Sequence, residues 1–267
     1  MNAIFHIPQD ALLSAYCSMI WEVRGMPPYH KETIFPRGFT EIIFNFSDTI
    51  SFHEPGSKAY KSAPRCVVQG ITTKAINSAF SGSHYFFGWR LKPLVAEKIF
   101  QIPSHELKDR VIDVTLFKPV FNDYWNHLGE MNTFHEKLEF TKNLFSKLEL
   151  KCSARIDFFQ GLLYNLNEPK LFTTVDQLAN YSCLSNRQLQ RKTKAIFGLS
   201  PSDIIRYQKF IKSVHYIHEN KYKLAEIAYL SGFSDQAHFC KVFKEFTGIL
   251  PKEYNKVKSH MPFHVYS

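Results

Sequence analysis

The sequence lacks long apolar runs, paired cysteines and an N-terminal leader pattern. No apolar stretch reaches the roughly 18 residues that a membrane-spanning helix requires, and Pro8, Gln9 and Asp10 interrupt the first segment before the core of a signal peptide forms. The five cysteines show no Cys-x-x-Cys pair and no histidine at zinc-site spacing. These absences predict a cytoplasmic globular protein with reduced thiols, no metal and no membrane partner.

Signatures of common enzymes are also missing. The chain contains no Gly-x-Ser-x-Gly motif and no glycine-rich phosphate loop. The histidines His6, His30, His53 and His84 lack the close spacing of metal ligands. We therefore expect that the protein is not an enzyme and uses no cofactor.

Acidic residues are scarce in the last hundred residues. Residues 168–267 hold 15 Lys and Arg against 8 Asp and Glu, whereas residues 1–167 hold 18 against 16. A basic part of this size suggests an anionic partner. Nucleic acid is favoured over a membrane, because no stretch combines a wide, bulky apolar face with a lysine-rich one.

The first hundred residues alternate apolar and polar side chains with the period of a β-strand. Residues 41–47 and 84–91 show this pattern, and His84 and Arg90 lie on the face opposite to Trp89. A β-rich part with little net charge fits a sensor domain, in which His84 and Arg90 are candidate polar groups of a ligand pocket. A packed sheet that leaves Arg90 at the surface fits the pattern as well.

After Pro93 the apolar period lengthens to that of a helix. Thr133-x-x-Glu136 forms a capping-box pattern, and we expect the apolar face of the following helix either to mediate a homodimer or to be buried within the chain. Another helix is expected within residues 154–166. We place a β-rich regulatory domain ending in helices at residues 1–155 and a helical domain at 156–267, with its core at 168–257.

The helical part carries one unit twice. Matches at a spacing of 49 and then 50 residues include the pairs Leu178/Ile227, Ala179/Ala228, Gly198/Gly248 and Pro201/Pro251. Each copy predicts a helix, a tight turn, a second helix, a Gly stop and a Pro-initiated helix. This is the helix-turn-helix pattern, which presents its second helix to the major groove of DNA. A short solenoid of helical hairpins is the alternative, although two copies are too few to stack stably.

The stretch "IAYLSGFSDQAHFCKVFKEFTGILPKEY", residues 227–254, resembles the signature of the AraC-type transcription regulators. The likeness covers about residues 168–257, whereas the first half resembles the sensor half of such regulators more loosely, in "FPRGFTEIIFNF" and "GWRLKP". It implies an α+β two-domain fold: a β-rich sensor domain, then an all-α domain of two helix-turn-helix units joined by a long helix at about 201–220. Thr193 departs from the family, which commonly has Phe there.

By this resemblance two recognition helices, residues 186–196 and 235–246, read successive major grooves of double-stranded DNA. We expect the first to bury Leu189 and Ile196. Arg and Gln offer paired hydrogen bonds to bases, whereas Lys mostly neutralises phosphate. The candidate contacts are Asn186, Arg187, Gln190, Arg191 and Lys194 in the first helix and Gln236, Ala237, His238, Cys240 and Lys241 in the second. A capping role for His238 fits the pattern equally well.

The resemblance also implies modulation by a small-molecule effector or partner at the N-terminal domain. It makes RNA polymerase and a second copy of the chain further candidate partners. Two other functions stay open at this point: a sequence-indifferent architectural DNA binder, and a ligand-binding enzyme with a helical appendage. An architectural protein would show similar affinity for random and selected duplexes at equal salt, and an enzyme would act on a metabolite without DNA.

Overall fold

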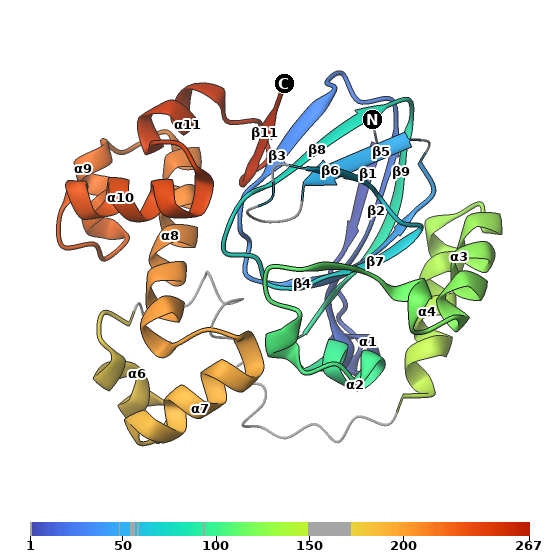
Figure 1. Ribbon diagram of the computed structural model, residues 1–267, viewed down its shortest axis with the longest axis horizontal. Coiled ribbons are helices and arrows are strands. Elements are labelled where there is room, and N and C mark those ends of the chain that lie inside the picture. Colours follow the sequence, from blue (N-terminus) through green and yellow to red (C-terminus); the bar gives the residue numbers. More distant parts are fainter. Residues whose placement is uncertain (1, 48, 54–56, 58, 93, 149–171) are drawn as a thin grey trace.

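The computed structural model describes residues 2–47, 49–53, 57, 59–92, 94–148 and 172–267. A β-rich N-terminal part is followed by a helical C-terminal part, which confirms the predicted fold class (Figure 1). The helix expected within residues 154–166 and the domain boundary expected near residue 155 lie outside the described residues. In the part of the chain that is described, no helix is both long and apolar enough to cross a membrane.

The strands belong to two antiparallel sheets. Sheet A has the order β1-β2-β9-β4-β7-β10 and sheet B the order β11-β3-β8-β5-β6. The strands of sheet A are β1 (Asn2–His6), β2 (Cys17–Gly25), β9 (His84–Leu91), β4 (Thr40–Asn45), β7 (Cys66–Gln69) and β10 (Val111–Asp113). Those of sheet B are β11 (His264–Tyr266), β3 (Lys31–Ile34), β8 (Ile76–Ser81), β5 (Thr49–His53) and β6 (Tyr60–Ser62). The two predicted strands, β4 and β9, are neighbours at the centre of sheet A.

The helices fall into two groups. Those of the N-terminal part are α1 (Ala11–Tyr16), α2 (Val95–Phe100), α3 (Val120–Glu130) and α4 (Phe134–Ser146), with the 3-10 turns η1 (Ser104–Glu106) and η2 (Val114–Leu116). Those of the C-terminal part are α6 (Val175–Tyr181), α7 (Asn186–Phe197), α8 (Pro201–Glu219), α9 (Leu224–Leu230), α10 (Gln236–Thr247) and α11 (Pro251–Val257). In Figure 1 α8 runs between the pair α6 and α7 at one end and the pair α9 and α10 at the other.

Helices cover one face of sheet A. Trp89 is fully buried there, and its indole nitrogen donates a hydrogen bond to the Thr141 hydroxyl of α4 at 3.0 Å. Phe145 of α4 is also fully buried and stacks on Tyr16. The Thr133 capping box forms as predicted. Leu138 and Phe145 of the apolar face of α4 are thus buried within their own chain, and dimerisation through this helix stays a prediction.

The helical part and the sheets also share a core. Phe35, which follows β3, is buried against Tyr254 of α11 and Phe243 of α10, with ring centroids 5.1 Å and 6.4 Å away. The hydroxyl of Tyr207 in α8 donates to the carbonyl of Thr72 at 2.7 Å and accepts from the amide of Gly38 at 2.9 Å. Because these groups are buried, their pairing fixes how the two parts dock.

One polar contact at this seam makes stability depend on pH. The hydroxyl of Tyr254 forms a hydrogen bond with Nε2 of His218, 2.6 Å away, and its oxygen accepts from the amide of Phe263. Burial, with help from Lys258 and His215 nearby, lowers the pKa of His218 to about 4. Between pH 6.5 and about 4 the folded chain therefore holds His218 mostly neutral, because burial disfavours the charged ring.

We predict that the protein loses stability as pH falls from about 6.5, the ordinary histidine pKa, toward 4. The unfolded chain takes up a proton at His218 in this window and the folded chain does not. The slope is bounded by about 1.4 kcal/mol per pH unit and should be smaller for this partly exposed ring. Denaturant unfolding at several pH values measures it. His218→Gln, which keeps an acceptor but does not titrate, should flatten the curve, and an unchanged slope would contradict the assignment.

Candidate nucleic-acid interface

The two helix-turn-helix units make the same turn with the same backbone hydrogen bonds. In the first, the amide of Leu184 donates to the carbonyl of Ala179 at 3.0 Å, and in the second the amide of Phe233 donates to Ala228 at 2.9 Å. Both turns pass through the left-handed region, with φ of 52° at Cys183 and 80° at Gly232. The repeat in the sequence is therefore a repeat of backbone geometry.

Helix α7 is defined by local signals at both ends. The side chains of Ser185 and Gln188 form a reciprocal capping box at its start, and Gly198 ends it with φ of 69°. Its buried face consists of Leu189, Thr193 and Phe197. Ile196, which was expected to be buried, is only half-buried, because Phe197 is the residue that points into the core.

The candidate contact residues of α7 are all exposed, but two of them are already engaged. The side-chain amide of Asn186 donates to Asp176 of α6 at 2.9 Å, and the ammonium group of Lys194 donates to the carbonyl of Gly198 at 3.3 Å. Three further side chains form no hydrogen bond or ion pair with any other described residue and so offer their polar atoms to solvent: Arg187, Gln190 and Arg191.

Helix α10 exposes fewer side chains that can form hydrogen bonds with bases than α7 does. Its buried residues are Phe239, Val242, Phe243, Phe246 and Thr247. Gln236, Ala237 and Lys241 are exposed, whereas His238 and Cys240 are half-buried.

His238 and Cys240 are tied to their own helix more than they were expected to be. The ring of His238 lies 3.1 Å from the hydroxyl of Ser234 and edge-on to Phe233, and its amide donates to the Asp235 carboxylate. The residue that caps α10 is therefore Asp235, and His238 contributes its backbone amide to that cap. Burial raises the pKa of the Cys240 thiol, which keeps it protonated and weakly nucleophilic.

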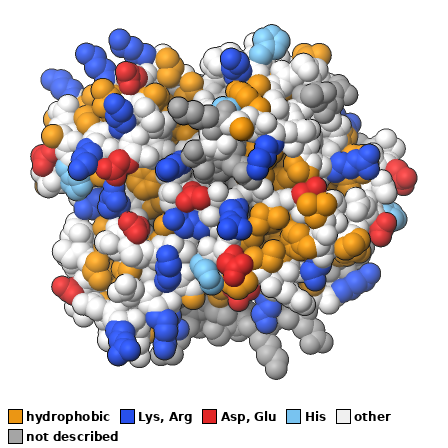
Figure 2. All heavy atoms as spheres, in the orientation of Figure 1, with side chains coloured by type: hydrophobic (Ala, Val, Ile, Leu, Met, Phe, Trp, Pro, Cys, Tyr) orange, Lys and Arg blue, Asp and Glu red, His pale blue; other side chains and the backbone are white. Residues whose placement is uncertain are grey.

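Helix α8 sets the distance between the units. It begins with a Ser200 capping box and Pro201 and has 19 residues, close to the predicted length. At 1.5 Å per residue it is about 28 Å long. Arg206 of α8 forms an ion pair with Glu245 of α10, which ties the helix to the second unit. In Figure 2 many Lys and Arg side chains lie over these C-terminal helices, as the uneven charge predicted.

The two residues proposed for a ligand pocket do not converge. His84 and Arg90 share a face of β9 but are six residues apart, which is about 20 Å along a strand. Arg90 pairs with the buried carboxylate of Glu41 at 3.3 Å and covers the ring of Phe39. His84 is buried against Phe80, with ring centroids 4.2 Å apart. One small ligand would not touch both.

Sequence reasoning missed Trp21, which lies on the same side of sheet A. Its ring packs over Gly88 so closely that a Cβ there would be 2.3 Å from the indole. Within the described residues, the buried indole nitrogen of Trp21 and the buried Nε2 of His84 have no hydrogen-bond partner. No pattern in the sequence marks Trp21, because its burial depends on the pairing of β2 with β9.

Parts of the chain match known domain families and known regulators. A helix-turn-helix domain model matches residues 178–256, and a domain of unknown function (DUF6597) matches residues 6–113. The regulator GbdR of Pseudomonas aeruginosa is 32% identical over 89 residues, which are 33% of this chain and 23% of that protein. The activator RhaS of Salmonella arizonae is 29% identical over 87 residues, 33% of this chain and 31% of that protein.

The C-terminal part of the chain is an AraC-type helix-turn-helix domain. The aligned segments span only about a quarter to a third of the length of these curated relatives. Among solved structures, ToxT of Vibrio cholerae is similar with a TM-score of 0.48 and 12% identity, over 89% of this chain and 98% of that chain.

The difference between the two turns in this domain predicts a difference in stability. A non-glycine residue in the left-handed region costs roughly 1–2 kcal/mol, and part of the gain from glycine is lost to its freer unfolded chain. Cys183→Gly should therefore raise the free energy of unfolding by about 0.5–1 kcal/mol. The matched change Gly232→Cys should lower it, and chemical denaturation measures both. A destabilised Cys183→Gly would show that the thiol makes a stabilising contact.

Proposed function

We propose that the chain is a sequence-specific DNA-binding transcription regulator whose helices α7 and α10 enter successive major grooves. The observation that carries this proposal is the pair of equivalent units on one helix, each with an exposed second helix. Support comes from relatives that are named transcriptional regulators and activators. Double-stranded DNA is the proposed partner. RNA polymerase is the candidate protein partner, since an activator and a repressor both change its use of a promoter.

We assign base reading mainly to α7. Arg187, Gln190 and Arg191 carry paired donors or acceptors that no other described residue uses, which is the chemistry of direct readout. Asn186 and Lys194 then serve as positioning contacts, the first through Asp176 and the second toward a phosphate.

We assign α10 a smaller share of base reading. Gln236 and Lys241 make the direct contacts, and Ala237 meets a thymine methyl group. His238 and Cys240 lie at the edge of the interface, because both side chains are half-buried in their own unit.

Arg191 tests the assignment of α7. Arg191→Ala should weaken the free energy of binding to the preferred duplex by about 1–3 kcal/mol and reduce the base preference at one base pair. Arg191→Lys should restore little, because lysine keeps the charge but not the planar fork. Binding titrations on duplexes selected from a random pool, and on their single-base variants, measure both effects.

Lys194→Ala is the matched control for charge. This variant should bind selected and random duplexes more weakly by about the same factor. The slope of log affinity against log salt concentration should fall by about one. Full affinity and unchanged base preference in Arg191→Lys would make Arg191 a phosphate contact. A random pool that yields no enriched sequence would favour the architectural alternative over the regulator.

We further propose that the N-terminal part binds a small polar effector. The supporting observation is the pair of buried donors or acceptors without described partners, Trp21 Nε1 and His84 Nε2, on one side of sheet A. An unpaired buried polar group costs about 1–3 kcal/mol, which a ligand that pairs with it recovers.

A thermal-shift screen of small polar metabolites tests the effector. A ligand at 100 times its Kd should stabilise the folded chain by about 2.7 kcal/mol. Trp21→Phe, which removes the indole donor but keeps an aromatic ring over Gly88, should reduce that shift. An equal shift in both proteins would place the ligand elsewhere.

A further inference from the structure

The last five residues of the chain, the C-terminal strap (residues 263–267), join the helical part to the edge of sheet B. Strand β11 lies within the strap and pairs antiparallel with β3, in a register that sets His264 opposite Ile34 and Tyr266 opposite Glu32. At the far end Ser267 and Lys31 exchange two backbone hydrogen bonds of 2.8 and 2.9 Å. The strap thus supplies the edge strand of a sheet that belongs to the other half of the molecule.

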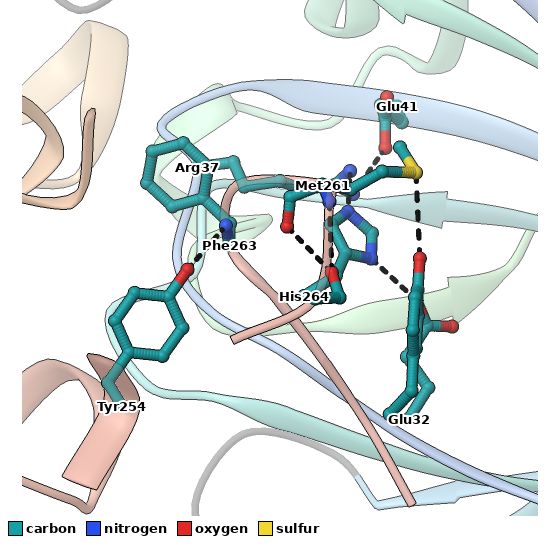
Figure 3. A network of polar contacts seen from close by, with 9 residues as sticks. Glu32, Arg37, Glu41, Tyr254, Met261, Phe263 and His264 are labelled. Carbon is teal, nitrogen blue, oxygen red and sulfur yellow. Dashed lines mark hydrogen bonds and ion pairs between the residues drawn. The ribbon is translucent and has the colours of Figure 1, made fainter. Parts of the chain in front are cut away.

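Polar and aromatic side chains reinforce this pairing (Figure 3). Nδ1 of His264 lies 2.5 Å from the carboxylate of Glu32, and Arg37 lies 3.5 Å from Nε2 of the same ring. Arg37 also forms an ion pair with the buried Glu41 of sheet A at 2.9 Å. Tyr266 stacks on Tyr29 with ring centroids 3.9 Å apart. The strap is therefore held to β3 by backbone pairing and by contacts between side chains.

The other end of the strap is anchored in the helical core. Phe263 is buried, faces His215 of α8 at a ring distance of 5.3 Å, and donates its amide to the hydroxyl of Tyr254 at 3.2 Å. Its backbone has φ of 71°, a strained conformation for an aromatic residue. The chain turns sharply there, from the helical core to the sheet.

The helical part does not need β11 for its own assembly. Helix α8 packs against α6 and α7 of the first unit and against α9 and α10 of the second. Since both recognition helices are already organised by α8, the strap adds no order between them. Its effect on DNA binding is a restraint on the second unit.

The first unit is restrained as well. The end of α7 packs against η1, and a Cβ at Gly198 would lie 3.1 Å from the Cβ of Lys108. Two recognition helices that enter successive major grooves must adopt the fixed spacing of the duplex, about 34 Å. Docking of both units against the N-terminal part restricts their movement toward that spacing.

We propose that the C-terminal strap is an autoinhibitory clasp: while β11 is paired with β3, the second unit is held against the sheets and the chain binds DNA weakly. This inference rests on the proposed DNA-binding function. Tyr29, which stacks on Tyr266, also packs edge-on against His84 at 6.4 Å. Tyr29 therefore links the strap to His84, one of the two residues assigned to the effector, and occupation of that site has a route to the clasp through this ring.

Two variants, one truncated and one of full length, test the clasp in opposite directions. Termination after Phe263 removes β11 but keeps the ring that fills the helical core. Thr33→Cys with Val265→Cys places two thiols at paired positions of β3 and β11, where Cα atoms in a hydrogen-bonded pair lie about 5.5 Å apart and permit a disulfide. On the selected duplex, the truncated chain should bind at least about 5-fold more tightly than the wild type, the low end of typical coupling between sites. The oxidised double variant should bind more weakly than the same protein after reduction.

Matched controls separate the clasp from damage to the fold and from failure of the proposed function. Each single cysteine variant should be insensitive to reductant, and the melting of the truncated chain should remain cooperative. Hydrogen exchange should show the amides of Lys31 and Phe35 losing protection when the wild type binds the selected duplex. Equal affinities of the truncated and full chains, or of the oxidised and reduced proteins, would overturn the clasp. A random pool with no enriched sequence would instead overturn the DNA-binding proposal.

Discussion

The side chain of Tyr254 is the contact on which the arrangement of this molecule depends. It is fully buried, and its ring lies between Phe35 of the N-terminal part and Phe243 of α10. Its hydroxyl serves two polar groups at once, His218 of α8 and the amide of Phe263. One residue thereby connects the end of the linker helix, the second recognition helix, the sheets and the C-terminal strap. Burial raises its pKa, so the phenol stays neutral and keeps its donor.

Local signals in the sequence were sufficient for the helical part. Ser185 with Gln188, Gly198 and Pro201 fix where helices begin and end through contacts within four residues, so α7 and α8 were predictable almost to the residue. The left-handed turn at Gly232 was predictable for the same reason. The degree of burial of neighbouring apolar residues depends on packing across the unit: Ile196 packs against the core but is only half-buried, and Phe197 is fully buried.

Contacts between distant segments were not predictable. Strand β11 has only three residues, and its pairing with β3 joins positions more than 200 residues apart. Nothing in "HVY" distinguishes it from a free chain end, because the partner strand supplies the hydrogen bonds and Glu32 and Tyr29 supply the side-chain contacts. The same holds for the candidate site: the sequence marks Asn186 as a polar residue on an exposed face, but only the fold shows that Asp176 holds it.

The two units divide the work of recognition unequally, and the strap acts on the weaker one. Helix α7 offers two arginines and a glutamine with unused polar atoms, whereas α10 offers mainly Gln236 and Lys241. Control is effective at the weaker unit, because binding of the second unit to the same duplex raises the overall affinity above that of the first unit alone. While the strap restrains the second unit, the exposed side chains of α7 can still contact DNA with low affinity. Release of the restraint adds the second set of contacts as an intramolecular step, at a high effective concentration set by α8. Control of DNA binding in this chain therefore depends on when the second unit binds the duplex beside the first. The position of the strap beside α11 and β3 suits that role.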